Sequence, residues 1–467
     1  MQPITKLIPH KKVHFIGIGG VGMSALAQLL LEQGYWVSGS DIKSNELTKR
    51  LETQGALIFL DHKAENIDNV DIIVRSSCIK DLNPEVILAR QKGIKLIHRA
   101  QLLAALMQEK SGIAVAGAHG KTTTTALISL MLQINGMSPT FAIGADVGSL
   151  GGNAQYGLGK YFVAEADESD GSFLYLKPNY AVITNIDKEH LDYYKDLEHI
   201  KKTYTSFIKN IQKNGLLICC GEDKNIAEII KSYSGKIITY GFSKNCDIYA
   251  FNVKTVAGAV TFKCIYKGDL IGEFRLNIPG IHNVLNSLAV ICLGVELEID
   301  RYIIEEALNV FSGANRRFQI KQNNSKIMIV DDYAHHPTEI EATLKAAKSL
   351  KKRRVIGVFQ PHRYSRTKFL KKEFGKCFSD ADEIVITDIY AASEAPIDGI
   401  EAHTIYKEVK QSGHKNVCFL PREKVREHLM LTIEKGDLLM MLGAGDIGKL
   451  ADEVARDFSR EKIKIKT

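Results

Sequence analysis

The residues IAVAGAHGKTTTT, numbers 113–125, form the pattern that decides the fold. The apolar run Ile113–Ala116 predicts a strand, the glycines predict a turn, and the spacing after them predicts a helix over Thr122–Gln133. In such a unit the backbone N–H groups can cradle phosphates, Lys121 can neutralise their oxygens and Thr122 can ligate Mg²⁺. The glycines lie closer together than in the GxxxxGK[ST] pattern, but every chemical part is present. We therefore predict a phosphate-binding loop inside an α/β domain.

The same alternation of apolar runs and helical patterns continues on both sides of this loop. A chain of 467 residues is long enough for about three domains. We predict an α/β fold in which each domain is built on a largely parallel sheet. Residues 1–107 form a Rossmann-like domain, residues 108–313 a P-loop ATPase-like domain with an added antiparallel sheet of short strands within 247–277, and residues 314–467 a second Rossmann-like domain. The polar stretch 108–112 marks the first boundary.

Composition argues against several other classes of protein. Lys and Arg total 61 and Asp and Glu total 54, and the surplus of +7 is not gathered in one stripe, so we expect no nucleic-acid partner. No apolar run reaches the ~18 residues of a membrane span, so we expect no membrane insertion. None of the eight cysteines belongs to a CxxC pair, which argues against zinc ligation by cysteine and fits a reducing cytoplasm. The first residues, MQPITKLIPHKK, lack the apolar segment of a secretory signal, which also indicates a cytoplasmic protein.

A second glycine-rich turn, GIGGVG at 17–22, follows a predicted strand and opens a predicted helix. Asp41 lies 24 residues after Gly17, at the end of the next predicted strand. These features are typical of a loop that holds a diphosphate on a helix N-terminus, while the carboxylate accepts a hydrogen bond from a ribose or base. The ligand would be a dinucleotide or another nucleotide diphosphate, and a tight turn without ligand is the alternative. A similar pattern at 443–448 is explained at least as well by close packing of the last helix.

Polar side chains follow two strands of the predicted central domain. The acidic group EADESD (165–170) follows one strand, and DKEHLD (187–192) follows the next. Because ligands bind at the carboxyl ends of parallel strands, a carboxylate of the first group could hold Mg²⁺, and His190 of the second could be a ligand. Solvated polar loops are the alternative reading.

Two further groups lie near the end of the predicted central domain. The polar residues of HNVLN (282–286) recur at one-turn spacing and could face one site, although an N-cap with exposed neighbours is the commoner explanation. An arginine of NRR (315–317) could reach a transferring phosphoryl group or form an ion pair between domains.

In the third domain, DDYAHHP (331–337) and QPHRYSRT (360–367) each follow a predicted strand. Consecutive strand ends of a parallel sheet border the binding crevice, so we expect both groups at one ligand site. Arg363 and Arg366 can clamp a carboxylate through paired hydrogen bonds.

Taken together, these motifs resemble the Mur ligase family, in order, from about residue 12 to residue 450. The stretches that carry the resemblance are HFIGIGGVGMSALA (14–27), GAHGKTTTT (117–125), AEADESD (164–170), TNIDKEHLD (184–192), PGIHNVLN (279–286), GANRRF (313–318), VDDYAHHPTEI (330–340) and FQPHRYSRT (359–367). The short glycine spacing at 117–120 is the form of P-loop found in that family.

The resemblance implies an ATP-dependent amide ligase of peptidoglycan precursor synthesis. In the branch that these motifs resemble most, ATP phosphorylates the lactyl carboxylate of UDP-N-acetylmuramate, and the amine of L-alanine attacks the acyl phosphate to give an amide, ADP and phosphate. The implied cofactors are ATP and Mg²⁺, with Mn²⁺ as a substitute, and the implied partners are these small molecules, with a monomer or dimer as the assembly.

The resemblance also implies roles for individual residues. The catalytic set is Lys121, His190 and Arg317. The ATP contacts are Gly117, His119, Gly120, Lys121, Thr122, Thr123, His282, Asn286 and Asp332. The UDP-sugar contacts are Gly17, Gly19, Gly22, Ser24 and Asp41. The amino-acid contacts are Tyr333, His335, Arg363 and Arg366. The metal ligands are Thr122, Glu165 and His190, with Glu168 as the alternative to Glu165.

Three other functions remain open from the sequence. An NAD-dependent dehydrogenase would use Gly17–Gly22 and Asp41 but would leave the loop at 117–125 without a role. A nucleotide-controlled binding module would hydrolyse ATP slowly and form no bond. A recycling ligase would add a whole tripeptide to the same sugar nucleotide.

Overall fold

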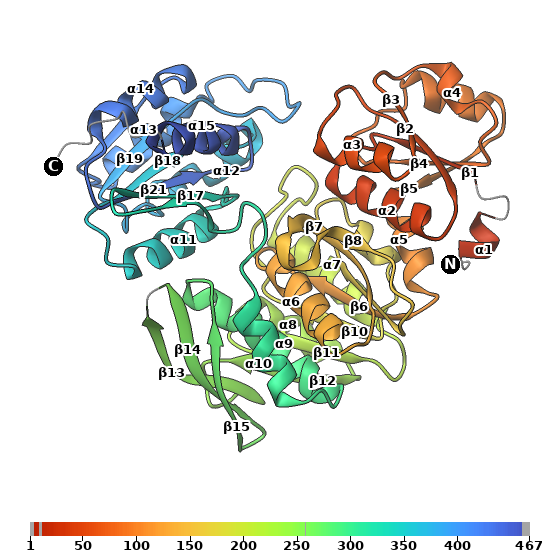
Figure 1. Ribbon diagram of the computed structural model, residues 1–467, viewed down its shortest axis with the longest axis horizontal. Helices are drawn as coiled ribbons and strands as arrows, with labels where there is room; N and C mark the ends of the chain where they lie inside the picture. Colours follow the sequence, from red (N-terminus) through yellow and green to blue (C-terminus); the bar gives the residue numbers. More distant parts are fainter. Residues whose placement is uncertain (1–3, 9–11, 257, 460–467) are drawn as a thin grey trace.

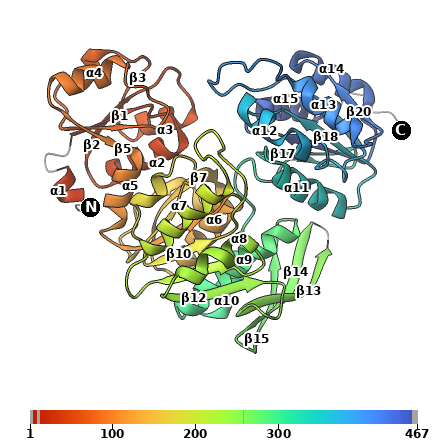
Figure 2. The same cartoon turned by 180° about the vertical axis from the view of Figure 1, so that it is seen from behind.

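The computed structural model describes residues 4–8, 12–256 and 258–459, and these form three lobes, each built on its own sheet. In Figure 1 the N-terminal lobe lies at the upper right, the C-terminal lobe at the upper left and the central lobe below them, with the strands β13–β15 at its lower edge. Figure 2 shows the same arrangement from behind. The predicted α/β architecture of three sheet-based domains is confirmed.

The N-terminal sheet is wholly parallel and has the order β3-β2-β1-β4-β5. Its strands are β1 Lys12–Ile16, β2 Trp36–Ser40, β3 Leu57–Phe59, β4 Ile72–Arg75 and β5 Lys95–His98. Its helices are α1 Ile4–Leu7, α2 Val21–Glu32, α3 Glu46–Thr53, α4 Pro84–Gln91 and α5 Arg99–Met107. The strand order reverses between β1 and β4, so the loop after β1 lies at the point where ligands bind in such sheets.

The central sheet has ten strands in the order β15-β14-β13-β12-β11-β10-β6-β9-β7-β8. Their bounds are β6 Ser111–Ala116, β7 Thr140–Val147, β8 Gly152–Gln155, β9 Tyr161–Glu165, β10 Tyr180–Ile183, β11 Leu216–Cys220, β12 Lys236–Gly241, β13 Ile248–Val256, β14 Ala259–Tyr266 and β15 Asp269–Leu276. The helices of this lobe are α6 Lys121–Ile134, α7 Leu197–Lys209, α8 Lys224–Ile229, α9 Ile281–Glu296 and α10 Arg301–Val310.

Two details of the central lobe differ from the expectation. The antiparallel strands β13, β14 and β15 are present but are eight or nine residues long, and β13 pairs in parallel with β12, so they extend the main sheet. Strand β6 begins at Ser111, so the polar stretch expected as a boundary already contributes two residues to the sheet. In both places pairing with a neighbouring strand extends the sheet: β13 pairs with β12, and the polar start of β6 pairs with β9.

The C-terminal sheet has the order β16-β17-β21-β18-β19-β20, and only β16 is antiparallel to its neighbour. Its strands are β16 Gln319–Asn323, β17 Ile327–Asp332, β18 Val355–Phe359, β19 Glu383–Ile386, β20 Val417–Phe419 and β21 Asp437–Leu442. Its helices are α11 Pro337–Ser349, α12 Tyr364–Phe374, α13 Ala402–Gln411, α14 Arg422–Thr432 and α15 Ile447–Ser459.

The N-terminal lobe is joined to the central lobe by ion pairs. The Arg50 guanidinium donates two hydrogen bonds to the Asp146 carboxylate, at 3.0 and 2.9 Å. Arg99 donates to Asp167 at 2.5 Å.

Among the described residues, no helix is both long enough and apolar enough to cross a bilayer.

Candidate nucleotide and ligation site

The phosphate-binding loop lies between β6 and α6, as predicted. Helix α6 begins at Lys121 after the N-cap residue Gly120, whose φ of +84° is left-handed and whose missing side chain leaves the first N–H groups of the helix without a side-chain cap. A Cβ on Gly117 would lie 2.0 Å from Thr184 Oγ1, and one on Gly120 would lie 2.5 Å from Asn286 Oδ1. The glycines are therefore required by the close approach of α9 and of the residue after β10. The Ala118 and His119 N–H groups donate to Asn185, and the N–H groups at the start of α6 are the donors that face an anion.

Lys121 lies at the start of α6 and points back over the loop. Its Nζ donates hydrogen bonds to the carbonyl of Gly117 at 2.5 Å and to Glu168 Oε1 at 2.8 Å. Burial lowers the pKa of Lys121, but the charge of Glu168 outweighs this effect and raises it, so the lysine stays protonated. His190 Nε2 lies 3.6 Å from the same Glu168 oxygen. Lys121, Glu168 and His190 therefore meet at the carboxyl edge of the sheet.

Glu165 and Glu168 take different positions. The Glu165 carboxylate accepts a hydrogen bond from the Gly144 N–H at 2.6 Å, and burial raises its pKa, while the Thr122 hydroxyl partly offsets this. Glu168 is paired with Lys121, and its Oε2 is buried without a hydrogen-bond partner among the described residues. Thr122 and Glu165 together offer hard oxygen donors near a carboxylate oxygen of Glu168 that has no hydrogen-bond partner among the described residues, which fits a divalent cation such as Mg²⁺.

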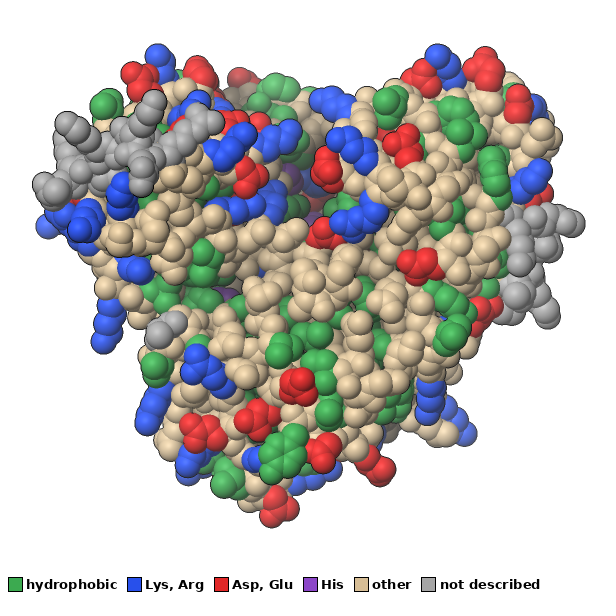
Figure 3. Space-filling model, viewed as in Figure 1, with side chains coloured by type: hydrophobic (Ala, Val, Ile, Leu, Met, Phe, Trp, Pro, Cys, Tyr) green, Lys and Arg blue, Asp and Glu red, His purple; other side chains and the backbone are tan. Residues whose placement is uncertain are grey.

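A cavity of about 410 Å³ opens beside the loop, between the central and C-terminal lobes. Its walls include most of the residues expected to contact ATP: His119, Gly120, Thr122, Thr123, His282, Asn286 and Asp332. Arg317, expected near the phosphates, also lines it. Figure 3 shows Lys and Arg side chains around the hollow between the two upper lobes, with histidine visible deeper inside. The cavity thus has the size and the surroundings of a nucleotide site.

The far wall of the cavity carries buried groups with shifted pKa values. Burial raises the pKa of Asp332 to about 6, although its carboxylate accepts hydrogen bonds from the Phe318 and Ala334 N–H groups, both at 2.7 Å. Burial lowers the pKa of His282 to about 4, so its imidazole is neutral at pH 7. The Arg317 guanidinium lies 5.1 Å from the centre of the Tyr333 ring. An adenosine in this cavity would meet a neutral imidazole and a carboxylate acceptor.

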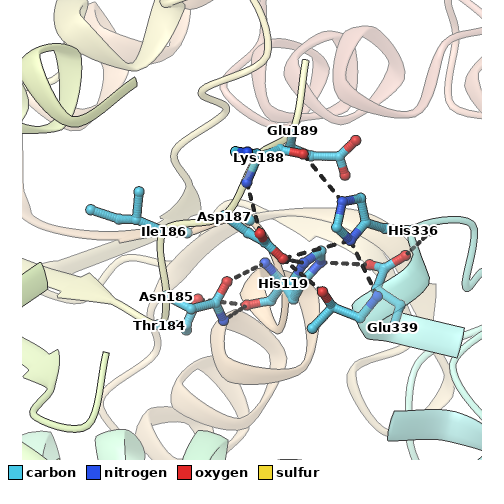
Figure 4. Close-up of polar contacts among 12 residues, drawn as sticks. His119, Thr184, Asn185, Ile186, Asp187, Lys188, Glu189, His336 and Glu339 are labelled. Atoms are coloured by element: carbon cyan, nitrogen blue, oxygen red, sulfur yellow. Dashed lines mark hydrogen bonds and ion pairs between the residues drawn. The ribbon is translucent and has the colours of Figure 1, made fainter. Parts of the chain in front are cut away.

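A polar network joins the two lobes at the mouth of the cavity (Figure 4). His119 Nε2 lies 3.1 Å from Asp187 Oδ2, and His119 Nδ1 lies 3.2 Å from Glu339 Oε1. Burial lowers the pKa of His119, but its contacts with these two carboxylates outweigh that effect and raise the pKa to about 10. Glu339 is a site residue that sequence reasoning missed. Glu339 occupies the third position of α11 and forms a capping box with the N-cap residue His336. A glutamate three residues after a helix N-cap is a recognisable sequence pattern, and it could have identified Glu339.

The expected amino-acid residues lie together at the carboxyl ends of β17 and β18. Arg366 donates to Glu189 Oε1 at 2.8 and 3.1 Å, and the two side chains are only 9% and 6% exposed. Arg363 donates to Asp192 Oδ2 at 2.9 Å. The partner Glu189 was also missed by sequence reasoning. Both arginines are therefore already paired with carboxylates from the loop that carries the candidate metal-binding histidine.

Aromatic rings border the same place. The His335 ring packs edge-on against the rings of Tyr333 and His362, with centroids 5.3 and 5.7 Å apart. A small cavity of about 20 Å³ lies next to them, lined by Glu189, His190 and both arginines among others. The structure therefore brings His190, Arg363 and Arg366 to the lining of one small cavity between the central and C-terminal lobes.

The glycine loop of the N-terminal lobe has the predicted strand–turn–helix context. Gly17 has a φ of +83°, and the Gly19 N–H donates to Asp41 Oδ2 at 2.9 Å. A Cβ on Gly22 would lie 3.7 Å from Arg99 Nη1. Ser24 is buried and donates to the carbonyl of Val21 within its own helix. In this structure Asp41 and Ser24 thus support the loop itself.

The third glycine pattern is explained by packing. A Cβ on Gly443 would lie 2.7 Å from the Gln360 carbonyl, and one on Gly448 would lie 2.9 Å from Asp331 Oδ2. The glycines at 443–448 therefore allow β21 and α15 to pack closely against β17 and the loop after β18.

These features define a three-domain P-loop nucleotide-binding protein whose site is shared between domains. The chain belongs to the Mur ligase family. Three family models match it: "Mur ligase family, catalytic domain" over residues 12–111, "Mur ligase middle domain" over 115–294 and "Mur ligase, glutamate ligase domain" over 316–445.

Individual relatives extend this result over nearly the whole chain. A UDP-N-acetylmuramate–L-alanine ligase of Geotalea uraniireducens is 48% identical over 455 residues, which are 97% of this chain and 98% of that protein. The protein of the same name from Geobacter sulfurreducens is 48% identical over 440 residues, 94% of this chain and 95% of the relative. The crystal structure of a UDP-N-acetylmuramate–alanine ligase from Thermotoga maritima matches with a TM-score of 0.83 at 31% identity, covering 97% of this chain and 100% of that one.

Proposed function

We propose that this chain is an ATP-dependent ligase that joins L-alanine to the lactyl carboxylate of UDP-N-acetylmuramate, in peptidoglycan precursor synthesis. The names of the relatives that match it end to end support this function. The observation that carries it is the shared cavity, in which the phosphate loop, Arg317 and Asp332 surround one nucleotide-sized space, next to the arginines of the C-terminal lobe. The family assignment leaves no support for the dehydrogenase alternative.

The phosphate end of the cavity is suited to activating a carboxylate. A carboxylate is a poor acyl donor, so it is first converted to an acyl phosphate, and two anions must then be held together. Lys121, the N-terminus of α6 and Arg317 supply positive charge for this purpose. Thr122, Glu165 and His190 would hold Mg²⁺, or Mn²⁺ in its place, and the cation would neutralise phosphate charge.

The other two ligands are assigned to the outer lobes. Tyr333, His335, Arg363 and Arg366 receive L-alanine, whose carboxylate takes over hydrogen bonds that Glu189 and Asp192 now accept. The loop at 17–22 with Asp41 supports the UDP moiety. Each proposed domain then binds one ligand: the UDP-sugar in residues 1–107, ATP in residues 108–313 and L-alanine in residues 314–467. We also propose a cytoplasmic location, a monomer or dimer, and no nucleic-acid partner.

A tripeptide-adding ligase is the nearest competing function, because a murein peptide ligase from Psychrobacter arcticus shares the fold with a TM-score of 0.71 at 22% identity. The relatives named UDP-N-acetylmuramate–L-alanine ligase match at 48% identity over at least 94% of this chain, which favours a single amino acid over a tripeptide.

Phosphate release with UDP-N-acetylmuramate, ATP and Mg²⁺ tests the proposal across single amino acids and the tripeptide. We expect release only when L-alanine and the sugar nucleotide are both present. Equal release without either substrate, or a preference for the tripeptide, would overturn it.

A further inference from the structure

Three side chains at the domain junction form a second group that could bind a metal ion, separate from Thr122, Glu165 and His190. His119 comes from the phosphate loop, Asp187 from the loop after β10, and His336 from the position before α11 (Figure 4). One ligand atom from each lies within 4.8 Å of the others. Two imidazoles and one carboxylate from three separate segments therefore converge on one point.

The far nitrogen of each imidazole lies near an oxygen atom: that of His336 within a hydrogen bond, that of His119 beside a carboxylate but without a hydrogen bond among the described residues. His119 Nδ1 faces Glu339 Oε1 at 3.2 Å, and His336 Nε2 faces the Lys188 carbonyl at 3.2 Å. This leaves His119 Nε2 and His336 Nδ1 directed at Asp187 Oδ2, at 3.1 and 3.6 Å. Metal-binding histidines usually donate their other N–H to a carboxylate or carbonyl in this manner, which fixes the tautomer and the ring.

The remaining contacts leave the Asp187 carboxylate and His336 Nδ1 available, whereas His119 Nε2 must first release the proton that it shares with Asp187. The Thr338 hydroxyl donates to Asp187 Oδ2 at 2.7 Å and orients the carboxylate. The Thr338 N–H approaches His336 Nδ1 only at 3.4 Å, so this nitrogen keeps a weakly used lone pair. Ligands around tetrahedral zinc at about 2.0–2.1 Å lie about 3.3 Å apart. The two distances from Asp187 Oδ2 to the imidazole nitrogens are close to that spacing. To bind the same ion, His119 Nε2 and His336 Nδ1 must also move toward each other.

The donor set indicates the class of cation. Imidazole nitrogens favour Zn²⁺, Co²⁺ or Ni²⁺, whereas Mg²⁺ prefers oxygen ligands and water. We propose that His119, Asp187 and His336 form an inhibitory site for Zn²⁺ and similar transition-metal ions, which fastens the phosphate loop to α11. His119 and Asp187 line the nucleotide cavity, so an ion held there competes with ATP. The inhibition rests on the proposed function; the binding of the ion does not.

Cobalt(II) titration of the full chain without nucleotide tests the site directly, because Co²⁺ bound by imidazole in a tetrahedral site gives intense visible absorption bands. We expect one Co²⁺ per chain and displacement of the bands by Zn²⁺. His336→Asn removes the imidazole but keeps a good helix N-cap, and it should abolish the bands. Glu339→Gln keeps the size and an amide oxygen of the residue that faces His119 Nδ1 and caps α11 with His336, and it should weaken binding by about 10- to 100-fold. His428→Asn on α14, far from the cluster in sequence, is the matched control and should bind as the unmodified chain does.

Zinc inhibition of ADP release at saturating Mg²⁺ gives the second readout, and His336→Asn should relieve it. The site is overturned if cobalt gives no bands, if His336→Asn keeps them, or if zinc inhibits both proteins equally. A chain without ligase activity would contradict the proposed function alone, because the cobalt spectrum still reports on the site. Circular dichroism of each variant, with Glu339→Gln as the milder change, separates loss of the site from loss of the fold.

Discussion

Removing the positive charge of Lys121 should damage the fold and the chemistry by two separable routes. The Lys121 and Glu168 side chains are 17% and 3% exposed, and their charged atoms are 2.8 Å apart. Lys121→Ala leaves the Glu168 carboxylate buried without its cation, and breaking a buried pair in this way costs about 3–5 kcal/mol. His190 lies 3.6 Å from the same oxygen and offsets part of the loss, so we expect about 3 kcal/mol.

A second substitution separates the two effects. Adding Glu168→Gln to Lys121→Ala removes the uncompensated charge, so most of the lost unfolding free energy should return. Activity should not return, because the phosphates still lack their cation, and we expect ADP release to stay at least ~10²-fold below that of the unmodified chain. Binding of the UDP-sugar should persist in both variants, since that ligand is assigned to the N-terminal lobe.

Urea denaturation, ADP release and calorimetric titration with the UDP-sugar measure these three quantities. Lys49→Ala serves as the control, because Lys49 and its partner Glu46 are 61% and 88% exposed and the pair should contribute less than about 1 kcal/mol. A Lys121→Ala protein within about 1 kcal/mol of the unmodified chain, or a double variant no more stable than the single one, would refute the reasoning.

Three further predictions concern other parts of the site. The Asp332 carboxylate has a pKa of about 6, so the affinity of the unmodified chain for an ATP analogue should rise about tenfold as pH increases through 6 and then level off. Asp332→Asn should remove this pH dependence. Calorimetry of the unmodified chain and of Asp332→Asn from pH 5 to 8 measures the two affinities. Protonation of the nucleotide phosphate affects both proteins alike, so parallel curves of affinity against pH would contradict the prediction. Arg366→Lys should raise KM for L-alanine about 10- to 100-fold through loss of paired hydrogen bonds while KM for ATP changes less than about twofold; equal changes in both would point to a general structural defect. Gly120→Ala places a Cβ 2.5 Å from Asn286 Oδ1 at a φ of +84°, so it should cost about 1–3 kcal/mol in urea denaturation and abolish ATP binding, whereas unchanged binding would show that the loop can relax.

The sequence contained much of the site because parallel sheets obey a simple rule. The carboxyl ends of neighbouring strands share one edge, so residues after β6, β9 and β10 had to lie close together. Lys121, Glu168 and His190 do so. The same rule placed Asp332 and Arg363 at the edge of the C-terminal sheet.

The sequence could not predict contacts that depend on how one lobe sits against another. Arg366 and Glu189 are 177 residues apart, and Thr338 and Asp187 are 151 apart, so no local pattern joins them. The different surroundings of the two metal-ligand candidates, Glu165 and Glu168, were also hidden. Only two residues lie between them, and the turn after β9, rather than composition, directs Glu165 toward Gly144 and Glu168 toward Lys121.

The nucleotide cavity has walls from two lobes, so movement of one lobe against the other changes the cavity. Separation of the two lobes would break the Asp187–Thr338 hydrogen bond and the buried Arg366–Glu189 ion pair, which both cross the junction beside this cavity. In many enzymes such opening, rather than the chemical step, limits the rate of turnover. Under the proposed function, substitutions that weaken the Asp187–Thr338 contact should shorten the time each ADP stays bound, because neither side chain is assigned to a reacting group.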